Sequence, residues 1–323
     1  MIALYIILGI MAFILIFFIV MGFVIESLGF SKRFDPDPLV KYYTNEEFNI
    51  EREPLKIKVG KETIRGYSYN PNSKIDDAIV VFVHGMYATI DAYNQEICTI
   101  AEAGYEVIAL NHIGVGTSTG KKITGLGGSL RCLDNTIDYV KANSKYSGRK
   151  IYVVGHSWGA YAAINIRKYH SDVNKIVAIA PFVSVNRLLI NLLDKSLKPF
   201  IPFITLADIC RNGSYSMQSA KSLKDNSNNI LVLHSKNDPM VSFDLNTGYL
   251  MDNYDNILFI ISNRNAHNPT YTLEAVEYMR EYTDELSCTP LDKQEELKRN
   301  TDFHKMGELN MKTMNEIISF LNK

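Results

Sequence analysis

The stretch VVGHSWGAYAA, residues 153–163, decides the fold of this chain because it carries one serine between two glycines. The β-branched residues at its start predict a buried strand, and the small residues at its end predict a helix. Ser157 therefore lies where the strand ends and the helix begins. So sharp a turn strains the backbone at the serine and leaves no room for side chains two positions away, where Gly155 and Gly159 stand.

A serine in this position is arranged to act as a nucleophile. Its hydroxyl projects from the end of the strand, and the backbone N–H groups of the helix start face any negative charge that develops there. A hydroxyl needs an oriented base, and in this geometry an acid and a histidine follow on loops after later strands. Asp238 follows the apolar run NILVLHS, and His267 follows NILFIIS. We therefore predict that Ser157 attacks, His267 moves the proton, and Asp238 orients the imidazole.

Other acids and bases fit this order less well. Asp208 and Asp244 do not closely follow a strand end, and His304 lies in a charged helical tract beyond the last strand. The remaining histidines are expected to orient loops through hydrogen bonds. The backbone N–H groups of Met86 and Trp158 are the expected oxyanion hole, since Met86 lies in the loop after AIVVFVHG and Trp158 follows the nucleophile.

Alternating strands and helices predict an α/β fold with a mostly parallel sheet. Further buried strands are predicted at YEVIALN and KIVAIAP, and LKIKVGKETIRGYSY predicts a hairpin. Helical spacing is clearest at residues 91–103, 129–143, 158–169 and 311–321. One domain over residues 55–323 accounts for this pattern, with an insertion at about 183–228 that contains no buried strand.

The beginning of the chain is a separate element. Residues 2–25 carry no charged side chain and span about 36 Å as a helix, enough to cross a bilayer. A secretory signal peptide is the rival interpretation, but it requires a shorter apolar region, a preceding Lys or Arg and a small-residue cleavage site. We predict a transmembrane anchor at residues 1–26 and a polar juxtamembrane linker at 27–54. Lys32, Arg33 and Lys41 follow the span and place the main domain in the cytoplasm.

Composition and spacing exclude several classes of function. The 323 residues are 46% hydrophobic and 21% charged with a net charge of −1, which suits a globular protein and offers no field to attract nucleic acid. No spacing of cysteine and histidine indicates a metal site. Cys98 and Cys132 occupy apolar helix positions and are expected to be buried free thiols. GVGTST, residues 114–119, lacks the third glycine of a dinucleotide fingerprint, so no cofactor is expected.

With these motifs the chain resembles the α/β-hydrolases, in the branch of monoacylglycerol lipases and serine or prolyl aminopeptidase-like enzymes. The resemblance covers roughly residues 55–323 and rests on His84-Gly85, NHIGVGTS, GHSWG, NDPMV and NAH. It implies an eight-stranded α/β-hydrolase fold, a serine triad, and a small helical cap after the sixth strand, where residues 183–228 lie. Asn111 and Ile113 stand where relatives have an acid and an arginine, and Tyr87 stands where many have glycine.

The apolar cap predicts the kind of substrate. Tyr87, Leu189, Phe200 and Phe203 are the candidate substrate contacts, and an apolar lining favours an acyl group. We therefore expect a membrane-anchored serine hydrolase that cleaves a small-molecule ester or lipid through an acyl-enzyme. An aminopeptidase-type amide hydrolase and an acyltransferase use the same residues, and a non-catalytic scaffold is the fourth possibility. The sequence gives no oligomeric state.

Overall fold

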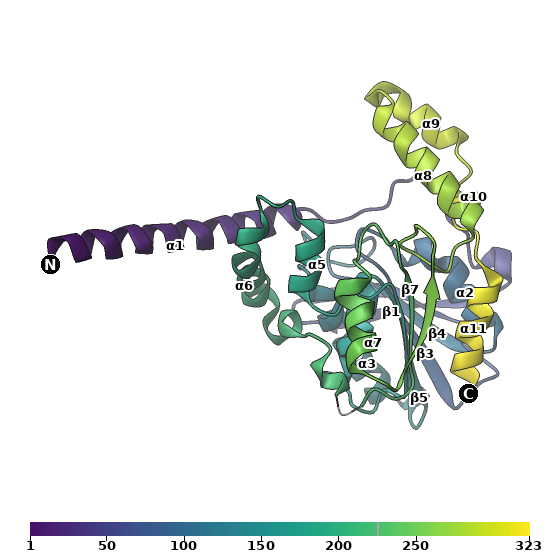
Figure 1. Cartoon of the computed structure of the whole chain (residues 1–323). Helices are drawn as coiled ribbons and strands as arrows, with labels where there is room; N and C mark the ends of the chain where they lie inside the picture. The colour runs from purple at the N-terminus through teal and green to yellow at the C-terminus, as the bar shows by residue number, and fades with distance from the viewer. Residues whose placement is uncertain (225) are drawn as a thin grey trace.

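One eight-stranded sheet forms the centre of the computed structural model, which describes residues 1–224 and 226–323 (Figure 1). The strand order is β1-β2-β4-β3-β5-β6-β7-β8. Strand β2 runs antiparallel to β1 and β4, and all other neighbours are parallel, so the predicted α/β-hydrolase architecture is confirmed. The strands are β1 (Arg52–Val59), β2 (Glu62–Tyr69), β3 (Ala78–Val83), β4 (Glu106–Asn111), β5 (Lys150–His156), β6 (Lys175–Ile179), β7 (Ile230–Ser235) and β8 (Ile257–Ser262).

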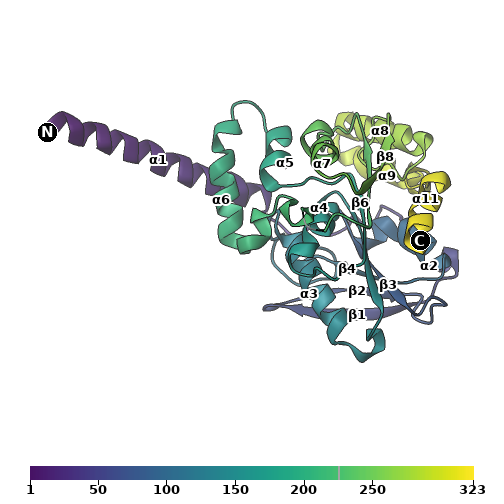
Figure 2. The same cartoon turned by 60° about the horizontal axis from the view of Figure 1, so that its bottom comes forward.

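The central strands are apolar throughout because helices cover both faces of the sheet. Every side chain of β3, β4 and β7 is buried. Helices α3 (Gly128–Ala142) and α4 (Trp158–Asn165) pack on one face. Helices α2 (Asn94–Glu102) and α11 (Met311–Asn322) pack on the other (Figure 2). Both thiols that were predicted to be buried, Cys98 and Cys132, lie in these layers.

The predicted hairpin begins three residues earlier than its sequence pattern indicates. Arg52 already pairs with Tyr69, because the polar residues before Leu55 lie on an edge strand that tolerates exposure. The turn falls at Gly60, whose φ of 61° suits glycine.

A helical insertion separates β6 from β7, as the sequence predicted. Its main helices are α5 (Val185–Leu192) and α6 (Ile201–Asn212), which stand over the carboxyl ends of the parallel strands (Figure 1). A second helical group follows β8 and projects away from the sheet. The α-helices after β7 and before α11 are α7 (Tyr249–Asn253), α8 (Leu273–Cys288), α9 (Gln294–Asn300) and α10 (Phe303–Met306).

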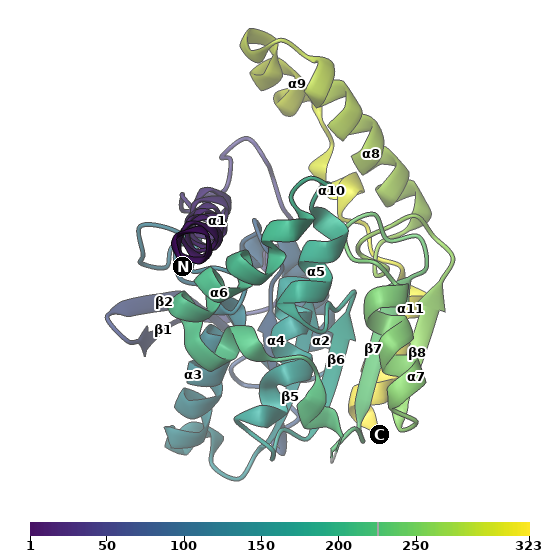
Figure 3. The ribbon, with the colours of Figure 1, turned by 60° about the vertical axis from the view of Figure 1, so that its left-hand side comes forward.

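Helix α1 (Ile2–Gly29) is long and apolar enough to cross a membrane by length and composition. Its first half projects from the molecule, and its last turns run beside α6 (Figures 1 and 3). The helix continues three residues beyond the predicted anchor.

The polar segment after α1 is hydrogen-bonded to the domain. Phe34 forms a bridge with Val115, and its N–H donates to the carbonyl of Gly114 at 2.8 Å. The Arg33 guanidinium donates to the carbonyl of Gly120 at 2.9 Å. Arg33 thus supplies a cation to the loop in which Ile113 replaces the arginine of the relatives.

Candidate active site

Ser157 lies on a tight turn between β5 and α4, with φ 53° and ψ −108°. Non-glycine residues avoid this backbone region, so the surrounding structure holds the serine under strain. A Cβ atom at Gly159 would collide with the carbonyl oxygen of Val83, and one at Gly155 would collide with that of Gly159. The two flanking glycines are therefore required by backbone that comes within van der Waals distance of them.

Asp238 and His267 lie in direct contact although 29 residues separate them. The imidazole Nδ1 lies 2.8 Å from Asp238 Oδ2 and 3.1 Å from Oδ1, so Nδ1 carries the proton and donates it to the carboxylate. The backbone N–H groups of Met240 and Val241 also donate to Asp238 Oδ1. Nε2 of His267 is left as an acceptor, which is the state that a general base requires.

A second imidazole fixes the same carboxylate. Nε2 of His234 donates to Asp238 Oδ2 at 3.0 Å, and its Nδ1 accepts from the Thr247 hydroxyl at 2.6 Å. Burial opposes ionisation of Asp238, but the hydrogen bonds from His234 and His267 outweigh it and hold the pKa of this carboxyl well below its usual range. The sequence predicted that histidines such as His234 would orient loops, and here that histidine orients the acid.

Ser157 and His267 line one cavity of about 340 Å³. Within the described residues no hydrogen bond joins the two side chains. Hydrogen bonds between a nucleophile and its base are commonly long without substrate and tighten when it binds.

A hydrogen-bonded relay connects the loop of Met86 with the loop of His267. The N–H of Gly85 donates to the Tyr93 hydroxyl at 3.1 Å, and this hydroxyl donates to His156 Nδ1 at 2.8 Å. Nε2 of His156 then donates to the carbonyl of His267 at 3.3 Å. Burial lowers the pKa of His156 to about 3, so its ring stays neutral. The residue beside the nucleophile thus fixes the backbone of the candidate base.

Glu96 of α2 forms hydrogen bonds with the loop of His267. Its Oε1 accepts from the Asn268 amide and from the Thr270 hydroxyl, each at 3.2 Å. Burial raises the pKa of this carboxyl to about 7. The two residues that it holds lie one and three positions after His267 in the chain.

The residues of the two expected oxyanion donors line the same cavity as Ser157. Trp158 begins α4, and Met86 lies in the loop after β3. His84 shapes that loop: its Nδ1 donates to the carbonyl of Gly85 at 2.7 Å, and its Nε2 accepts from the N–H of His112 at 3.1 Å. Among the described residues neither the Met86 nor the Trp158 amide donates to a protein acceptor outside regular structure, so both are available to an oxyanion.

The cavity wall is mostly apolar, and its residues come from segments spread along the chain from α1 to the loop of His267. Tyr87 and Leu189, predicted as substrate contacts, line it. Phe200 and Phe203, predicted with them, do not line it, because both rings pack against Phe18 of α1, Phe200 from the turn before α6 and Phe203 from α6 itself. The lining residues are Ile25, Glu26, Gly29, Phe30, Met86, Tyr87, Leu126, Ser157, Trp158, Phe182, Leu188, Leu189, Leu192, Leu193, Ile204, Asp208, Met240, Val241 and His267.

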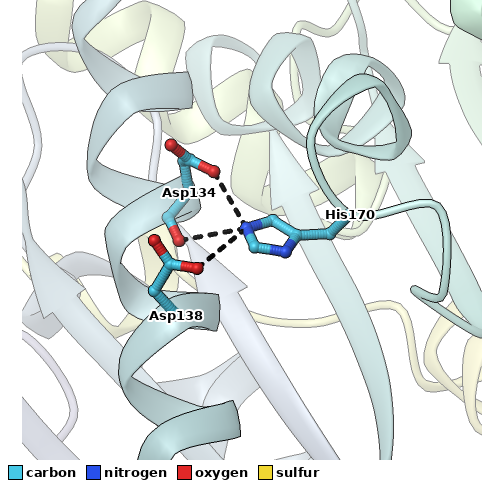
Figure 4. Close-up of side chains that lie close together, drawn as sticks. All are labelled: Asp134, Asp138 and His170. Atoms are coloured by element: carbon cyan, nitrogen blue, oxygen red, sulfur yellow. Dashed lines mark hydrogen bonds and ion pairs between the residues drawn. The ribbon is translucent and has the colours of Figure 1, made fainter.

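One cluster of metal-ligating residue types occurs in the part of the chain that the structure describes, and none of its three residues lines this cavity (Figure 4). His170 Nε2 lies 2.8 Å from Asp134 Oδ1 and 3.8 Å from Asp138 Oδ1. Nδ1 of the same ring accepts from the Lys141 ammonium at 3.0 Å. The ring therefore carries its proton on Nε2 and donates it to Asp134, and a neighbouring cation disfavours a metal ion. These contacts hold α3 against the segment that follows α4.

The fold and the site together define an α/β-hydrolase. A family model described as "Serine aminopeptidase, S33" matches residues 74–266, more than half of the chain, so the chain belongs to this hydrolase family.

Solved structures share the fold at low sequence identity. An esterase of Pyrococcus furiosus, Pf2001, has a TM-score of 0.55 and 16% identity over 79% of this chain and 95% of its own. Est1E of Butyrivibrio proteoclasticus, solved with ferulic acid bound, has a TM-score of 0.52 and 17% identity over 73% of this chain and 100% of its own. At this identity the likeness concerns the fold alone.

A curated relative matches only a short segment. Epoxide hydrolase B of Mycobacterium tuberculosis is 30% identical over 94 residues, which is 29% of this chain and 26% of that protein. The chain thus spans about a quarter of the length of the curated relatives that it matches.

Sequence reasoning missed the residues that support the site from a distance. Glu96 and Tyr93 lie on a helix and a turn more than 140 residues before His267, and no local pattern connects them with it. A buried glutamate in an otherwise apolar helix face was the available signal, since charged side chains are rarely buried without a partner.

Proposed function

We propose that this hydrolase cleaves carboxylic esters of apolar acyl groups through an acyl-enzyme, while α1 anchors it in a membrane. The observation that carries the proposal is the contact of the His267 imidazole with the buried Asp238 carboxylate, in a cavity that Ser157 shares. Nε2 of His267 is the free base of that pair, and Ser157 is the strained hydroxyl at a helix start.

The chemistry follows in two balanced steps. Ser157 Oγ attacks the ester carbonyl carbon as His267 Nε2 takes its proton, and the carbonyl oxygen becomes an oxyanion that the Met86 and Trp158 amides stabilise. The leaving alcohol takes the proton from His267 and departs, which leaves an acyl group on Ser157. Water then attacks this acyl group as His267 Nε2 takes its proton, and His267 returns that proton to Ser157 Oγ when the acid product leaves. Asp238 stabilises the imidazolium in both steps.

An amide hydrolase that recognises a free amino terminus is the second candidate, and one observation favours it: two carboxylates, Glu26 and Asp208, line the cavity. Both carboxylates already accept hydrogen bonds from other groups of the protein. Glu26 accepts from the Arg211 guanidinium at 2.8 Å, and Asp208 accepts from the N–H groups of Leu126 and Gly127 at 2.8 and 3.1 Å. An ammonium group would have to displace these partners, so we favour the ester.

A substrate panel tests the proposal. The full chain in detergent micelles is assayed with p-nitrophenyl acetate, octanoate and dodecanoate and with aminoacyl p-nitroanilides, each against Ser157→Ala. We expect ester hydrolysis that falls by more than about 10⁴-fold in kcat for Ser157→Ala. Higher kcat/KM on the aminoacyl anilides would favour the peptidase, and unchanged ester hydrolysis in Ser157→Ala would exclude the mechanism.

A further inference from the structure

The end of the apolar helix α1 reaches the candidate active site. Ile25, Glu26 and Gly29 line the same cavity as Ser157 and His267, and so does Phe30, which follows the helix. A helix that serves only as a tether has no need to contact the cavity of the domain it carries.

Close packing holds this part of α1 on the cap. Gly22 lies against α6 so tightly that a Cβ atom there would lie within 3 Å of the Phe203 carbonyl carbon and the Ile204 nitrogen. One turn before Gly22, Phe18 stacks on Phe200 with ring centroids 4.8 Å apart. Small residues permit such close approach of two helix backbones, so Gly22 gives α1 a specific packing contact with α6.

Polar contacts fix the last turn of α1 to α6 and to the loop after β3. Glu26 is only 3% exposed and pairs with Arg211 of α6. The Tyr87 hydroxyl, from the loop of the candidate oxyanion donor, donates to the carbonyl of Gly29 at 2.6 Å. A buried carboxylate is costly without its partner, so these bonds define one position of the helix relative to the site.

We propose that the last two turns of α1 form a wall of the acyl-binding pocket, so that the enzyme takes a long acyl chain lying alongside its own anchor. This inference rests on the proposed ester hydrolysis. It makes the anchor a determinant of chain-length specificity, and it assigns the substrate to esters of long-chain fatty acids held in a bilayer.

The length of α1 places this wall at the membrane surface. A hydrocarbon core of about 30 Å takes about 20 helical residues, so a span that starts at Ile2 ends near residue 21. Ile25 then lies only about 6 Å further along the helix. An acyl chain that leaves the bilayer beside α1 therefore meets the pocket without crossing bulk water.

A pair of adjacent substitutions tests the wall. Ile25→Trp fills the pocket from α1, whereas Val24→Trp adds the same ring one residue away, at a position that is 42% exposed and outside the lining. The measurement is the ratio of kcat/KM for p-nitrophenyl dodecanoate to that for the acetate. We expect Ile25→Trp to lower this ratio about tenfold, since each methylene kept out of an apolar site costs about fourfold. Ile25→Phe should lower it less, and Val24→Trp should leave it within twofold of wild type.

An unchanged ratio in Ile25→Trp, or an equal fall in both tryptophan variants, would overturn the inference. Melting temperatures of all variants establish that the fold is intact.

A readout without catalysis separates this inference from the proposed reaction. Dodecanoic acid with a terminal diazirine is irradiated with the full chain, and crosslinks to the buried Leu188 and Leu189 across the cavity are counted by mass spectrometry. Ile25→Trp should reduce these crosslinks severalfold and Val24→Trp should not. Equal crosslinking in both variants refutes the wall even if esters are cleaved. Loss of Ser157-dependent hydrolysis with retained selective crosslinking refutes the reaction alone.

Discussion

Replacing Glu96 by glutamine should stabilise the protein above neutral pH and have little effect in acid. The side chain is 2% exposed, and its described hydrogen-bond partners are the neutral side chains of Asn268 and Thr270. Burial therefore raises the pKa of the carboxyl from 4.5 to about 7. Between these pH values the folded chain keeps a proton that the unfolded chain releases, so the free energy of unfolding falls as the pH rises.

The shift sets the size of the effect. A difference of about 2.5 pH units corresponds to about 3 kcal/mol at 1.36 kcal/mol per unit, of which about 2.5 kcal/mol is lost between pH 5 and pH 8. Glutamine keeps the acceptor oxygen and has no charge to bury, so Glu96→Gln escapes this loss. The unfolding entropy of a chain of this length is about 0.7 kcal/mol per kelvin. The variant should therefore gain about 4 °C in Tm, relative to wild type, on going from pH 5 to pH 8.

The assay is thermal unfolding followed by circular dichroism in one detergent at both pH values. Glu102→Gln is the matched control, because Glu102 lies on the same helix and is exposed. Its Tm difference from wild type should not change with pH. If Glu96→Gln shows the same pH-independent difference, the buried carboxyl is not neutralised by its surroundings and the reasoning fails.

Two further substitutions test the contacts around the site. Tyr93→Phe leaves the Gly85 N–H and His156 Nδ1 without their common partner. We therefore expect the free energy of unfolding to fall by about 2 kcal/mol, and kcat to fall with little change in KM. An unchanged kcat would show that these hydrogen bonds do not position the loops. Gly22→Leu should separate α1 from α6 and speed amide hydrogen exchange over residues 201–212. Gly9→Leu should not, because nothing lies within 4 Å of the added Cβ. Equal exchange in the two variants would mean that α1 does not pack against α6 in solution.

Local patterns were sufficient to predict the sheet and the loops that carry the candidate catalytic residues. Runs of β-branched residues identify strands buried on both faces, and such strands bring their carboxyl ends to one edge of the sheet. That geometry explains why Asp238 and His267, each chosen from its place after a strand, lie within hydrogen-bond distance. The role of each residue in catalysis remains a prediction.

Contacts between distant segments had no such signal. Glu26 and Arg211 are 185 residues apart, and nothing in either segment indicates that they pair. Without that pairing, Phe200 and Phe203 were assigned to the substrate because they are apolar and belong to the cap. The structure turns them toward Phe18 of α1, and an apolar pattern alone cannot distinguish a pocket wall from a helix seam.

The central claim is that the hydroxyl of Ser157 is the nucleophile, and covalent labelling tests it most directly. The full chain is treated with a fluorophosphonate, digested, and analysed by mass spectrometry for the modified peptide. Wild type and the control Ser171→Ala, at an exposed serine, should carry the label on Ser157, and Ser157→Ala should carry none. Labelling that persists in Ser157→Ala, or that falls on another serine of the wild type, would contradict the account.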